Sequence, residues 1–572
     1  MNPIIRAKKT TSLYVLIFAV AALSPAVRAV LPPPDGGYPG RNTAEGQAAL
    51  FSLTTGEFNT AVGFGSLRSD TTNSYNTAIG ASALSNNMAD HNTATGASAL
   101  LDNSTGSRNT ADGSFALSNN TTGSFNTAVG VNALFRNTTG SNNTAVGINA
   151  LGSNTTGSFN TVNGGNALSS NTTGHNNTAV GFTALFRNTT GSFNTANGVD
   201  ALRLNTTGNR NTANGDRALF SNTTGSFNTA NGVDALSLNT TGDENTAIGD
   251  AALFSNTTGS FNTANGVHAL FSNTTGDENT ANGDDALGSN TIGNRNTANG
   301  TSALFSNTTG DDNNATGFNA LVNNTTGFDN NATGVEALFS NTTGFKNAAY
   351  GDDALENNTS GNRNTAFGNN AGKNLTTGSN NIDIGDDVVG VAGESNKIRI
   401  GTVGTQNATF IAGISGVAVT GSQVMVNSNG QLGVTGSSAR FKQAIKPMEK
   451  ASEAILALKP VTFRYKKEID PEGTPQFGLV AEDVEKVNPD LVVRDKEGKT
   501  YSVRYDHVNA MLLNEFLKAY RRMQDLEARD AQQEKQIEAL TRQLREQAAQ
   551  IQKGNAQREL RESGPEVATN NQ

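Results

Sequence analysis

The chain has 572 residues, of which 62 are glycine, none is cysteine or tryptophan, and 16% are charged, with a formal net charge of −9. The absence of cysteine excludes a disulfide framework, a cysteine-ligated zinc ion and a cysteine nucleophile. The acidic balance argues against a nucleic-acid partner, because phosphate backbones bind basic surfaces. The four histidines (91, 175, 268 and 507) lie far apart in sequence, so we expect no metal site and no cofactor.

Lysine divides the chain into two different parts. None occurs between Lys9 and Lys346, whereas 12 of the 17 lysines follow residue 436. The composition therefore predicts a long stem joined to a C-terminal module of ordinary globular composition.

Residues 1–29 have the pattern of a secretory signal peptide. Basic residues at 6–9 precede an apolar run at 12–23, and small residues follow up to Ala29. This apolar run is too short to span a bilayer as a helix. We predict cleavage after Ala29, a linker at 30–41, and export to the extracellular space or the cell surface. An uncleaved membrane anchor is the alternative.

A 17-residue repeat fills residues 42–396. After one 16-residue step between Asn76 and Asn92, the motif Asn-Thr-Ala-x-Gly recurs at a strict period, and there are 21 copies in all. A fixed period of this kind identifies a repeat architecture. Glycine every 7 to 10 residues of the consensus is incompatible with helices. We therefore predict a parallel β-solenoid with two short strands and two turns in each repeat.

The consensus N-T-A-x-G-x-x-A-L-x-x-N-T-T-G-x-x is seen at 126–142. Its small and apolar residues, here Ala128, Ala133 and Leu134, are expected in the core. Gly130 and Gly140 are expected where the chain turns, with positive φ. Asn137 and the threonine pair after it suit a turn, since short polar side chains bond the local backbone. The same triplet reads as a glycosylation signal, but its place in the same turn of every repeat favours turn chemistry.

Three other interpretations of the repeats were weighed. The polar, glycine-rich composition is also that of a disordered segment, but disorder gives no reason to keep alanine, leucine and glycine in phase. A calcium-binding β-roll has a nine-residue repeat with regular aspartates, and here the aspartates are irregular. Regular threonines could also present an ice-binding or glycan-binding surface, although the T-T-G motif places its threonines in a turn.

One coil offers little apolar surface against the entropy of ordering its backbone, ~1–2 kcal/mol per residue. We therefore expect the stem to be a homotrimer on the order of 100 Å long, at ~4.8 Å per coil. The Ala-x-Gly core resembles the head repeats of trimeric autotransporter adhesins, although the period here is longer. Those adhesins end in a membrane-anchoring barrel, whereas residues 566–572 are polar. We expect no self-anchoring membrane barrel.

Residues 397–436 are predicted to form a β connector. Short apolar runs at 410–414 and 424–426 are separated by glycine and serine. Asn429-Gly430 predicts a tight hairpin turn before a further short strand at 432–434.

Residues 437–515 have a mixed α/β pattern, with a helix predicted at 442–458, a strand at 461–465, a helix at 481–487 and a long final helix after residue 505. Four ordered motifs stand in this module: SSARFK at 437–442, LKPVTFRY at 458–465, FGLVAEDV at 477–484 and the run at 505–513. Together they resemble the endosialidase-type intramolecular chaperone domain, peptidase family S74, which lies at the C-terminus of trimeric phage tail spikes.

The resemblance implies a domain that helps a β-stem to trimerise and then cuts itself off with a serine–lysine dyad. The family's nucleophile falls on Ser437 and its lysine on Lys442. Ser438 stands where aspartate commonly follows the nucleophile, which leaves open the choice between the two serines and whether cleavage occurs. The alternative is that Lys442 is a solvated residue at the start of a helix.

A heptad seam is predicted at 516–555. Phe516, Met523, Ile537, Leu544 and Ile551 are spaced by seven or multiples of seven, and Ala519, Leu526 and Leu540 occupy the companion positions. Such a pattern is typical of a coiled coil, and three chains held in this way would set the register of a slowly pairing parallel stem. Residues 556–572 are predicted to be a disordered tail.

These observations predict an exported trimeric fibre or adhesin-like structural protein with a C-terminal chaperone, at most a single-turnover self-cleaving serine endopeptidase. Its partners are other copies of itself, and a cell-surface or glycan receptor is a candidate. The alternatives are a fibre whose trimerisation cap does not cleave, and a solenoid that binds glycans or ice.

Overall fold

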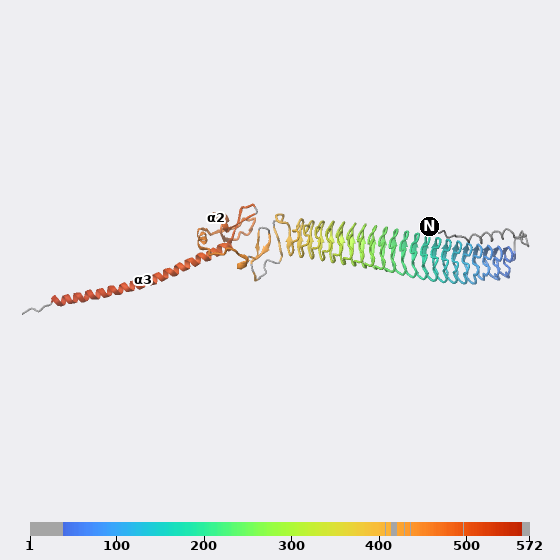
Figure 1. Cartoon of the computed structure of the whole chain (residues 1–572), viewed down its shortest axis with the longest axis horizontal. Helices are drawn as coiled ribbons and strands as arrows, with labels where there is room; N and C mark the ends of the chain where they lie inside the picture. Colours follow the sequence, from blue (N-terminus) through green and yellow to red (C-terminus); the bar gives the residue numbers. More distant parts are fainter. Residues whose placement is uncertain are drawn as a thin grey trace, which may run out of the picture. The chain divides into compact units, whose positions relative to one another are not determined.

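We describe a computed structural model of the chain for residues 38–562, except residues 407, 413–419, 422, 428–429, 435 and 496. The predicted signal peptide, residues 30–37 of the linker and residues 563–572 of the predicted tail lie outside the described residues. The chain divides into two compact units between Thr409 and Phe410. Each unit is described by itself (Figure 1).

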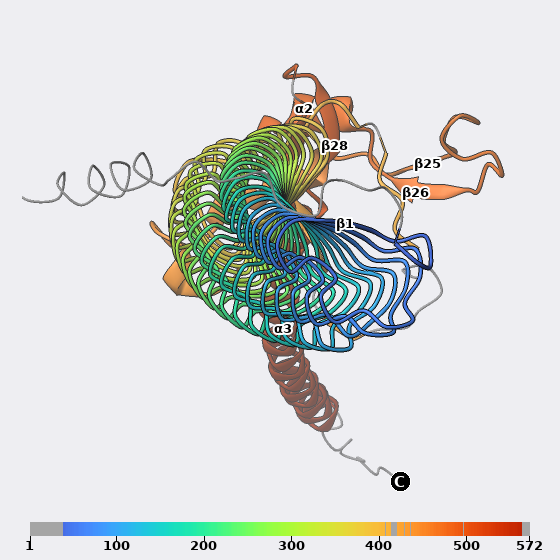
Figure 2. The ribbon, with the colours of Figure 1, turned by 90° about the vertical axis from the view of Figure 1, so that its right-hand side faces the viewer.

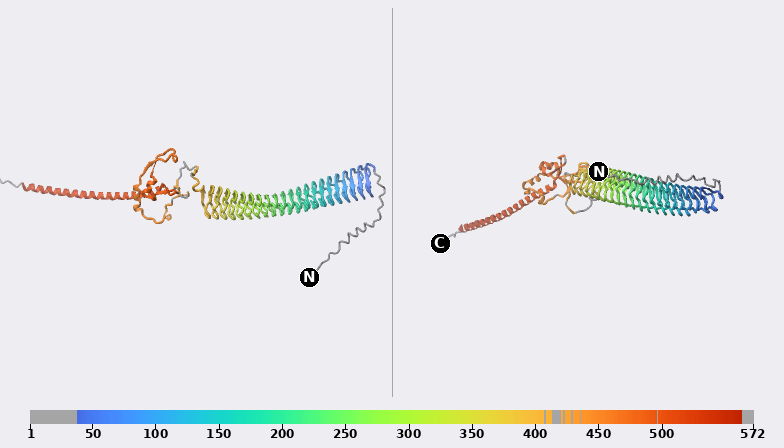
Figure 3. Two further views of the ribbon diagram at one scale, coloured as in Figure 1. Left: turned by 90° about the horizontal axis from the view of Figure 1, so that it is seen from above. Right: turned by 45° about the vertical axis from the view of Figure 1, so that its right-hand side comes forward.

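The first unit is a parallel β-solenoid, which confirms the predicted fold class. Every strand pairs in parallel and in register with its counterpart one coil later, so that Thr127 lies opposite Thr144 and Ala128 opposite Ala145. Figures 2 and 3 show the coils lying one against the next, each slightly rotated from its neighbour. The strands are β1 (Thr43–Glu45), β2 (Thr60–Val62), β3 (Thr77–Ile79), β4 (Thr93–Thr95), β5 (Thr110–Asp112), β6 (Thr127–Val129), β7 (Thr144–Val146), β8 (Thr161–Asn163), β9 (Thr178–Val180), β10 (Thr195–Asn197), β11 (Thr212–Asn214), β12 (Thr229–Asn231), β13 (Thr246–Ile248), β14 (Thr263–Asn265), β15 (Thr280–Asn282), β16 (Thr297–Asn299), β17 (Asn314–Thr316), β18 (Asn331–Thr333), β19 (Ala348–Tyr350), β20 (Thr365–Phe367), β21 (Ile382–Ile384) and β22 (Ile398–Ile400).

Each described coil contains one strand, so the prediction of two strands per repeat was wrong. The reason is the backbone around the core leucine: Asn132 and Leu134 have left-handed φ angles of 57° and 53°. Such residues cannot extend into a strand. The side of the coil opposite β6 is nevertheless bonded to its neighbour, because Leu134 N–H donates to the Ala150 carbonyl at 3.0 Å and Thr138 N–H to the Thr155 carbonyl at 3.0 Å.

The two consensus glycines have different roles. Gly130 has a φ of 124°, as expected. Gly140 is outside the left-handed region, and that part of the prediction was wrong. It is required instead by close approach, since a Cβ on Gly140 would collide with the carbonyl oxygen of Gly157 in the next coil.

The core of the stem is narrow and confirms the predicted apolar positions. Ala128, Ala133 and Leu134 are completely buried, as are their counterparts along most of the stack. The two consensus asparagines are also completely buried, which the sequence interpretation missed.

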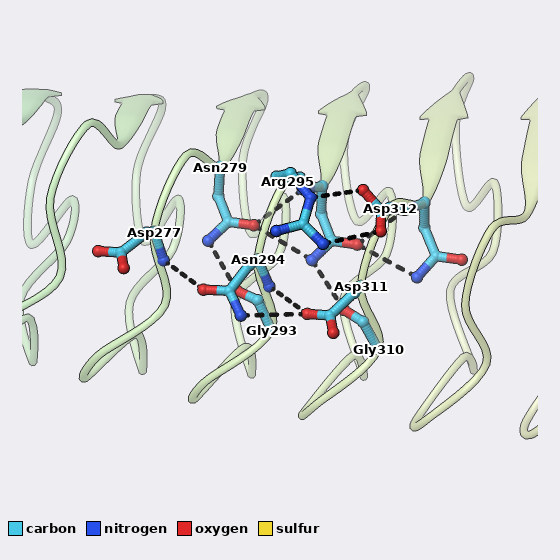
Figure 4. A network of polar contacts seen from close by, with 10 residues as sticks. Asp277, Asn279, Gly293, Asn294, Arg295, Gly310, Asp311 and Asp312 are labelled. Atoms are coloured by element: carbon cyan, nitrogen blue, oxygen red, sulfur yellow. Dashed lines mark hydrogen bonds and ion pairs between the residues drawn. The ribbon is translucent and has the colours of Figure 1, made fainter.

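These asparagines form two ladders of side-chain amides. Asn137 Nδ2 donates to Asn120 Oδ1 at 2.7 Å and to the Gly140 carbonyl at 2.9 Å. Asn126 Oδ1 accepts from the backbone N–H of Asn143 at 3.0 Å. Figure 4 shows the ladder that contains Asn126 further along the stack, where its counterpart Asn279 donates from Nδ2 to the Gly293 carbonyl at 2.8 Å. The repeated asparagine is therefore an interior residue rather than a surface turn residue.

A third polar column lies on the outside of the same turn. Asn294 Oδ1 accepts from Asp277 N–H at 2.8 Å, and Asp311 Oδ1 accepts from Asn294 N–H at 2.7 Å (Figure 4). Beside it, Arg295 forms a bidentate pair with Asp312 at 2.7 and 2.9 Å. The requirement for an acceptor at this position explains why it is so often serine, asparagine or aspartate.

The second unit is a small α/β region followed by a long helix. Its described elements are β23 (Met425–Val426), β24 (Leu432–Gly433), η1 (Ala439–Phe441), η2 (Glu449–Ala457), β25 (Val461–Phe463), β26 (Gln476–Gly478), α2 (Ala481–Val487), η3 (Pro489–Leu491), β27 (Val492–Arg494), β28 (Thr500–Val503) and α3 (Tyr505–Glu562). Three antiparallel hairpins, β23–β24, β25–β26 and β27–β28, are present. Val484, Leu491, Val492, Val503 and Met511 form its buried core.

Several predicted elements of this unit are confirmed. The hairpin around Gly430 is closed by Asn427 N–H donating to the Gln431 carbonyl at 3.1 Å, although its turn residue Asn429 lies outside the described residues. Helix α2 has the predicted bounds. Helix α3 extends to Glu562, so residues 556–562 of the predicted tail are helical.

The predicted helix at 442–458 is not continuous. Residues 439–441 and 449–457 form separate 3₁₀ segments. Pro447 disfavours helical backbone at the residue before it, and Ala444 has a left-handed φ of 55°. This break separates the start of the module from η2.

Candidate functional site

The structure brings the two predicted site residues together. Ser437 precedes η1, and Lys442 follows it, with Lys442 N–H donating to the Ala439 carbonyl at 3.0 Å. This turn returns the Lys442 side chain to the serine, and Nζ donates to Ser437 Oγ at 3.4 Å. Both side chains are exposed.

The neighbouring backbone is also held by the turn. The ring of Phe441 lies against Gly436, where an added Cβ would be 2.9 Å from Phe441 Cδ2. The Arg440 guanidinium lies over the same Phe441 ring, 4.5 Å from its centre. Gly436, the residue before Ser437, is therefore in contact with the Phe441 ring. The Ser438 side chain makes no capping hydrogen bond to η1.

A second serine–lysine pair joins η2 to α3, and the sequence interpretation did not find it. Ser452 is completely buried. Its hydroxyl lies 2.5 Å from Glu515 Oε1, 2.6 Å from Asn514 Nδ2 and 3.2 Å from Lys518 Nζ. No sequence spacing would have linked these residues, because about sixty positions separate Ser452 from the rest.

This buried cluster is suited to fastening two elements rather than to chemistry. Lys518 Nζ is held by Glu515 at 2.6 Å. The Lys518 ammonium and the Ser452 hydroxyl hold the pKa of Glu515 below its usual range. Ser452 is completely buried, whereas Ser437 is exposed.

The predicted seam on α3 is uncovered in the single chain. The side chains that form it are more than half exposed: Phe516 64%, Met523 51%, Leu526 52%, Ile537 61%, Leu540 58%, Leu544 64% and Ile551 63%. The described part of the single chain therefore leaves this apolar stripe on α3 exposed to solvent. Asp530, Gln533 and Gln547 interrupt it.

The described residues contain neither a metal-binding cluster nor a membrane-spanning helix. No group of three or more histidine, cysteine, aspartate or glutamate side chains in that part of the chain is placed to hold a metal ion. No helix among the described residues is long and apolar enough to cross a bilayer.

Comparison with known proteins confirms the family that the four sequence motifs of the second unit predict. Residues 437–493 match the family model Peptidase_S74, described as the chaperone of endosialidase. No curated protein and no solved structure matches the chain significantly. The match begins at Ser437 and ends within β27, so α3 and the residues that hold Ser452 lie beyond it. The chain therefore carries a peptidase S74 endosialidase-chaperone domain at residues 437–493, after a long β-solenoid stem.

Proposed function

We propose that the protein is an exported, trimeric, adhesin-like fibre whose C-terminal chaperone domain drives trimerisation and then separates itself from the stem at Ser437. The observation that carries the proposal is the contact between Lys442 Nζ and Ser437 Oγ at the first residue of the chaperone match. The uncovered seam on α3 supports association of identical chains. The resemblance of the repeats to adhesin heads supports a fibre.

The proposed reaction cleaves the bond between Gly436 and Ser437. Lys442 in its neutral form accepts the Ser437 hydroxyl proton as Oγ attacks the Gly436 carbonyl carbon. The C–N bond breaks, the Ser437 nitrogen leaves as an amine after taking up that proton, and an ester joins Gly436 to Oγ. Water then hydrolyses the ester, which leaves a carboxylate at Gly436 and a new amino terminus at Ser437.

Assembly supplies what the single chain lacks. A lysine becomes a base when its surroundings desolvate it, and both Lys442 and Ser437 are exposed in one chain. Packing of three chaperone domains around this turn would remove water from the pair. Cleavage would then follow trimerisation rather than precede it.

The same exposure favours a second candidate, a trimerisation cap that stays attached. The side chain at 438 is serine, and it makes no hydrogen bond that would orient the turn. In this case the chaperone domain would promote trimerisation of the stem and stay covalently attached to its C-terminal end.

Intact mass of the denatured, purified protein distinguishes the two. Wild type is expected to give two fragments that meet between Gly436 and Ser437, and Ser437→Ala and Lys442→Met are expected to give one uncut chain. Ser438→Ala is the matched control and should still be cut. If Ser438→Ala alone stops the cut, the neighbouring serine is the nucleophile, and an uncut wild-type trimer would favour the attached cap.

A further inference from the structure

One outer column of the stem contains a stack of aromatic rings with a gap. The column consists of the residue directly after the core leucine of each coil. Phe254 and Phe271 occupy it in adjacent coils and stack with their ring centres 5.3 Å apart and 7° between their planes. Gly288 takes the next place, and Phe305 the one after. Gly288 therefore interrupts the column, and the Phe305 ring leans over it, 3.0 Å from the place of an added Cβ. On the Phe271 side, the His268 ring packs edge-on with Phe271 at 5.4 Å between ring centres.

A shallow, open hollow remains beside Gly288, and one of its walls carries a carboxylate. It has a volume of about 230 Å³, and its lining includes Phe271, Gly288, Phe305 and Asp285. Asp285 is the residue two before the core leucine of the same coil as Gly288. Its carboxylate faces His268, with Oδ1 3.5 Å from His268 Nδ1. No other side chain among the described residues donates to that carboxylate.

An equivalent place elsewhere on the stem shows what fits. Arg203 follows its core leucine as Gly288 does. Its guanidinium carbon lies 5.6 Å from the ring centre of Phe220 in the next coil. Its Nε lies 3.5 Å from Oδ1 of Asp200, which stands two before that leucine. Asp200 thus corresponds to Asp285, and Phe220 corresponds to Phe305.

We propose that the hollow at Gly288 binds the guanidinium group of an arginine side chain presented by another polypeptide. The hollow has a carboxylate and a ring at the places that receive Arg203, with Asp285 in the same coil as Gly288 and Phe305 in the next coil, but it lacks the arginine. A planar cation entering from outside would stack against the exposed ring of Phe305 and pair with Asp285. The proposal concerns the stem alone and does not rest on the function proposed for the chaperone domain.

The chemistry distinguishes arginine from its substitutes. Lysine carries the charge but has no plane to stack between rings, and citrulline has the plane but no charge. A phenylalanine side chain would complete the apolar stack without using Asp285. Both contacts are partly exposed, so a single arginine should bind weakly, with a dissociation constant of about 1 mM or higher.

The test uses the full-length protein, immobilised, and short capped glycine peptides with arginine, lysine, citrulline or phenylalanine at the centre. Steady-state surface plasmon resonance should show the arginine peptide binding at least fivefold more tightly than the other three. Asp285→Asn should weaken it at least fivefold. Asn is tolerated there, because the φ of 55° at this position suits asparagine.

Filling the hollow supplies the decisive variants. Gly288→Phe and Gly288→Arg should each abolish arginine binding, since both restore a side chain that other coils carry. Gly152→Phe, at the same column position in a distant coil, is the matched control and should leave binding unchanged. Equal binding by wild type and both Gly288 variants would overturn the site. Preference for the phenylalanine peptide would show an apolar slot instead, and equal affinity for lysine would show simple charge attraction.

Discussion

At the scale of single residues, the asparagine ladder is the feature on which the stem depends most. Each amide donates to the preceding coil and to its own turn, and accepts from the next coil. Asn222, for example, donates to Asn205 at 2.8 Å and to Gly225 at 2.9 Å, while Asn239 donates to it at 2.8 Å. Removal of one amide would leave buried polar groups on both sides without partners.

Asn222→Ala is therefore expected to destabilise its coil and both neighbours. Each buried group left without a partner costs about 1–3 kcal/mol. Because repeat stems unfold in parts, the measurement is hydrogen exchange resolved by coil rather than one melting temperature. Thr224→Ala, at an exposed position of the same turn, should leave exchange unchanged. Equal protection in the two variants would mean that the ladder contributes little.

Asp70 replaces a ladder asparagine near the start of the stem. It is completely buried and accepts from Asn73 and Asn76 at 2.9–3.2 Å. Burial raises the pKa of Asp70, against the opposing effect of these hydrogen bonds. A carboxyl whose pKa is raised on folding favours the folded state below its unfolded pKa, and this contribution is lost as pH rises through the folded value.

Asp70→Asn is expected to raise the stability of the first coils at neutral pH, since the amide carries no charge to bury. The gain should shrink as pH is lowered below the raised pKa of Asp70, where the wild-type carboxyl is protonated. Hydrogen exchange of the first coils in both proteins, corrected for the intrinsic rate at pH 7 and at pH 4, measures the difference. Asp102→Asn, at an exposed position, should show no such pH-dependent gain. A constant or growing difference towards acid pH would contradict the expectation.

At the scale of elements, the charges beside the α3 seam favour a parallel assembly. Arg522 and Arg529 come directly before seam positions 523 and 530. Glu527 follows Arg522 by five residues, and Glu534 follows Arg529 by five residues. In a parallel coiled coil these positions of neighbouring chains face each other and pair. An antiparallel arrangement would bring like charges together. This pattern supports the parallel orientation that the proposed assembly requires.

Ile537→Asp should weaken self-association at least tenfold. It removes an apolar contact of ~1.5–3 kcal/mol per chain and places a carboxylate from every chain at one level. Ala539→Asp adds the same charge away from the seam and is the control. Size-exclusion chromatography with light scattering over a range of concentrations measures the change. Dissociation of both variants alike would indicate a general charge effect.

The features that follow from the repeat period were predicted from the sequence, whereas those that depend on backbone angles were not. A 17-residue period and buried Ala-Leu pairs were enough for a parallel solenoid. The left-handed leucines were not predictable, because leucine has no preference for that region, and they removed the second strand. The asparagines were assigned to turns because asparagine is common in turns. Their burial and their hydrogen bonds to the neighbouring coil, which show that they lie inside, depend on the three-dimensional stacking of the coils. Ser437 and Lys442 were found through a motif, whereas Ser452 and Lys518 share no local pattern.

At the scale of the whole stem, the last coils close the core with charge. Asp383 takes the place of the core alanine in β21, and Arg399 takes it in β22, where they pair at 3.3 Å. Glu394 holds the other side of the Arg399 guanidinium at 2.5 Å. Solenoid stacks need a terminal repeat that does not accept another apolar coil. These three residues supply such an end within the stem.

The direction of the coil-to-coil bonds has a mechanical consequence. Backbone bonds and both amide ladders run along the stack, so tension between its two ends loads successive coils in series. The weakest coil yields first, and the others keep their contacts. Each coil that opens lengthens the chain from ~4.8 Å to as much as ~60 Å, at 3.3–3.6 Å for each of its 17 residues. Under force the stem would extend in steps and absorb work coil by coil, rather than break as a rigid rod does.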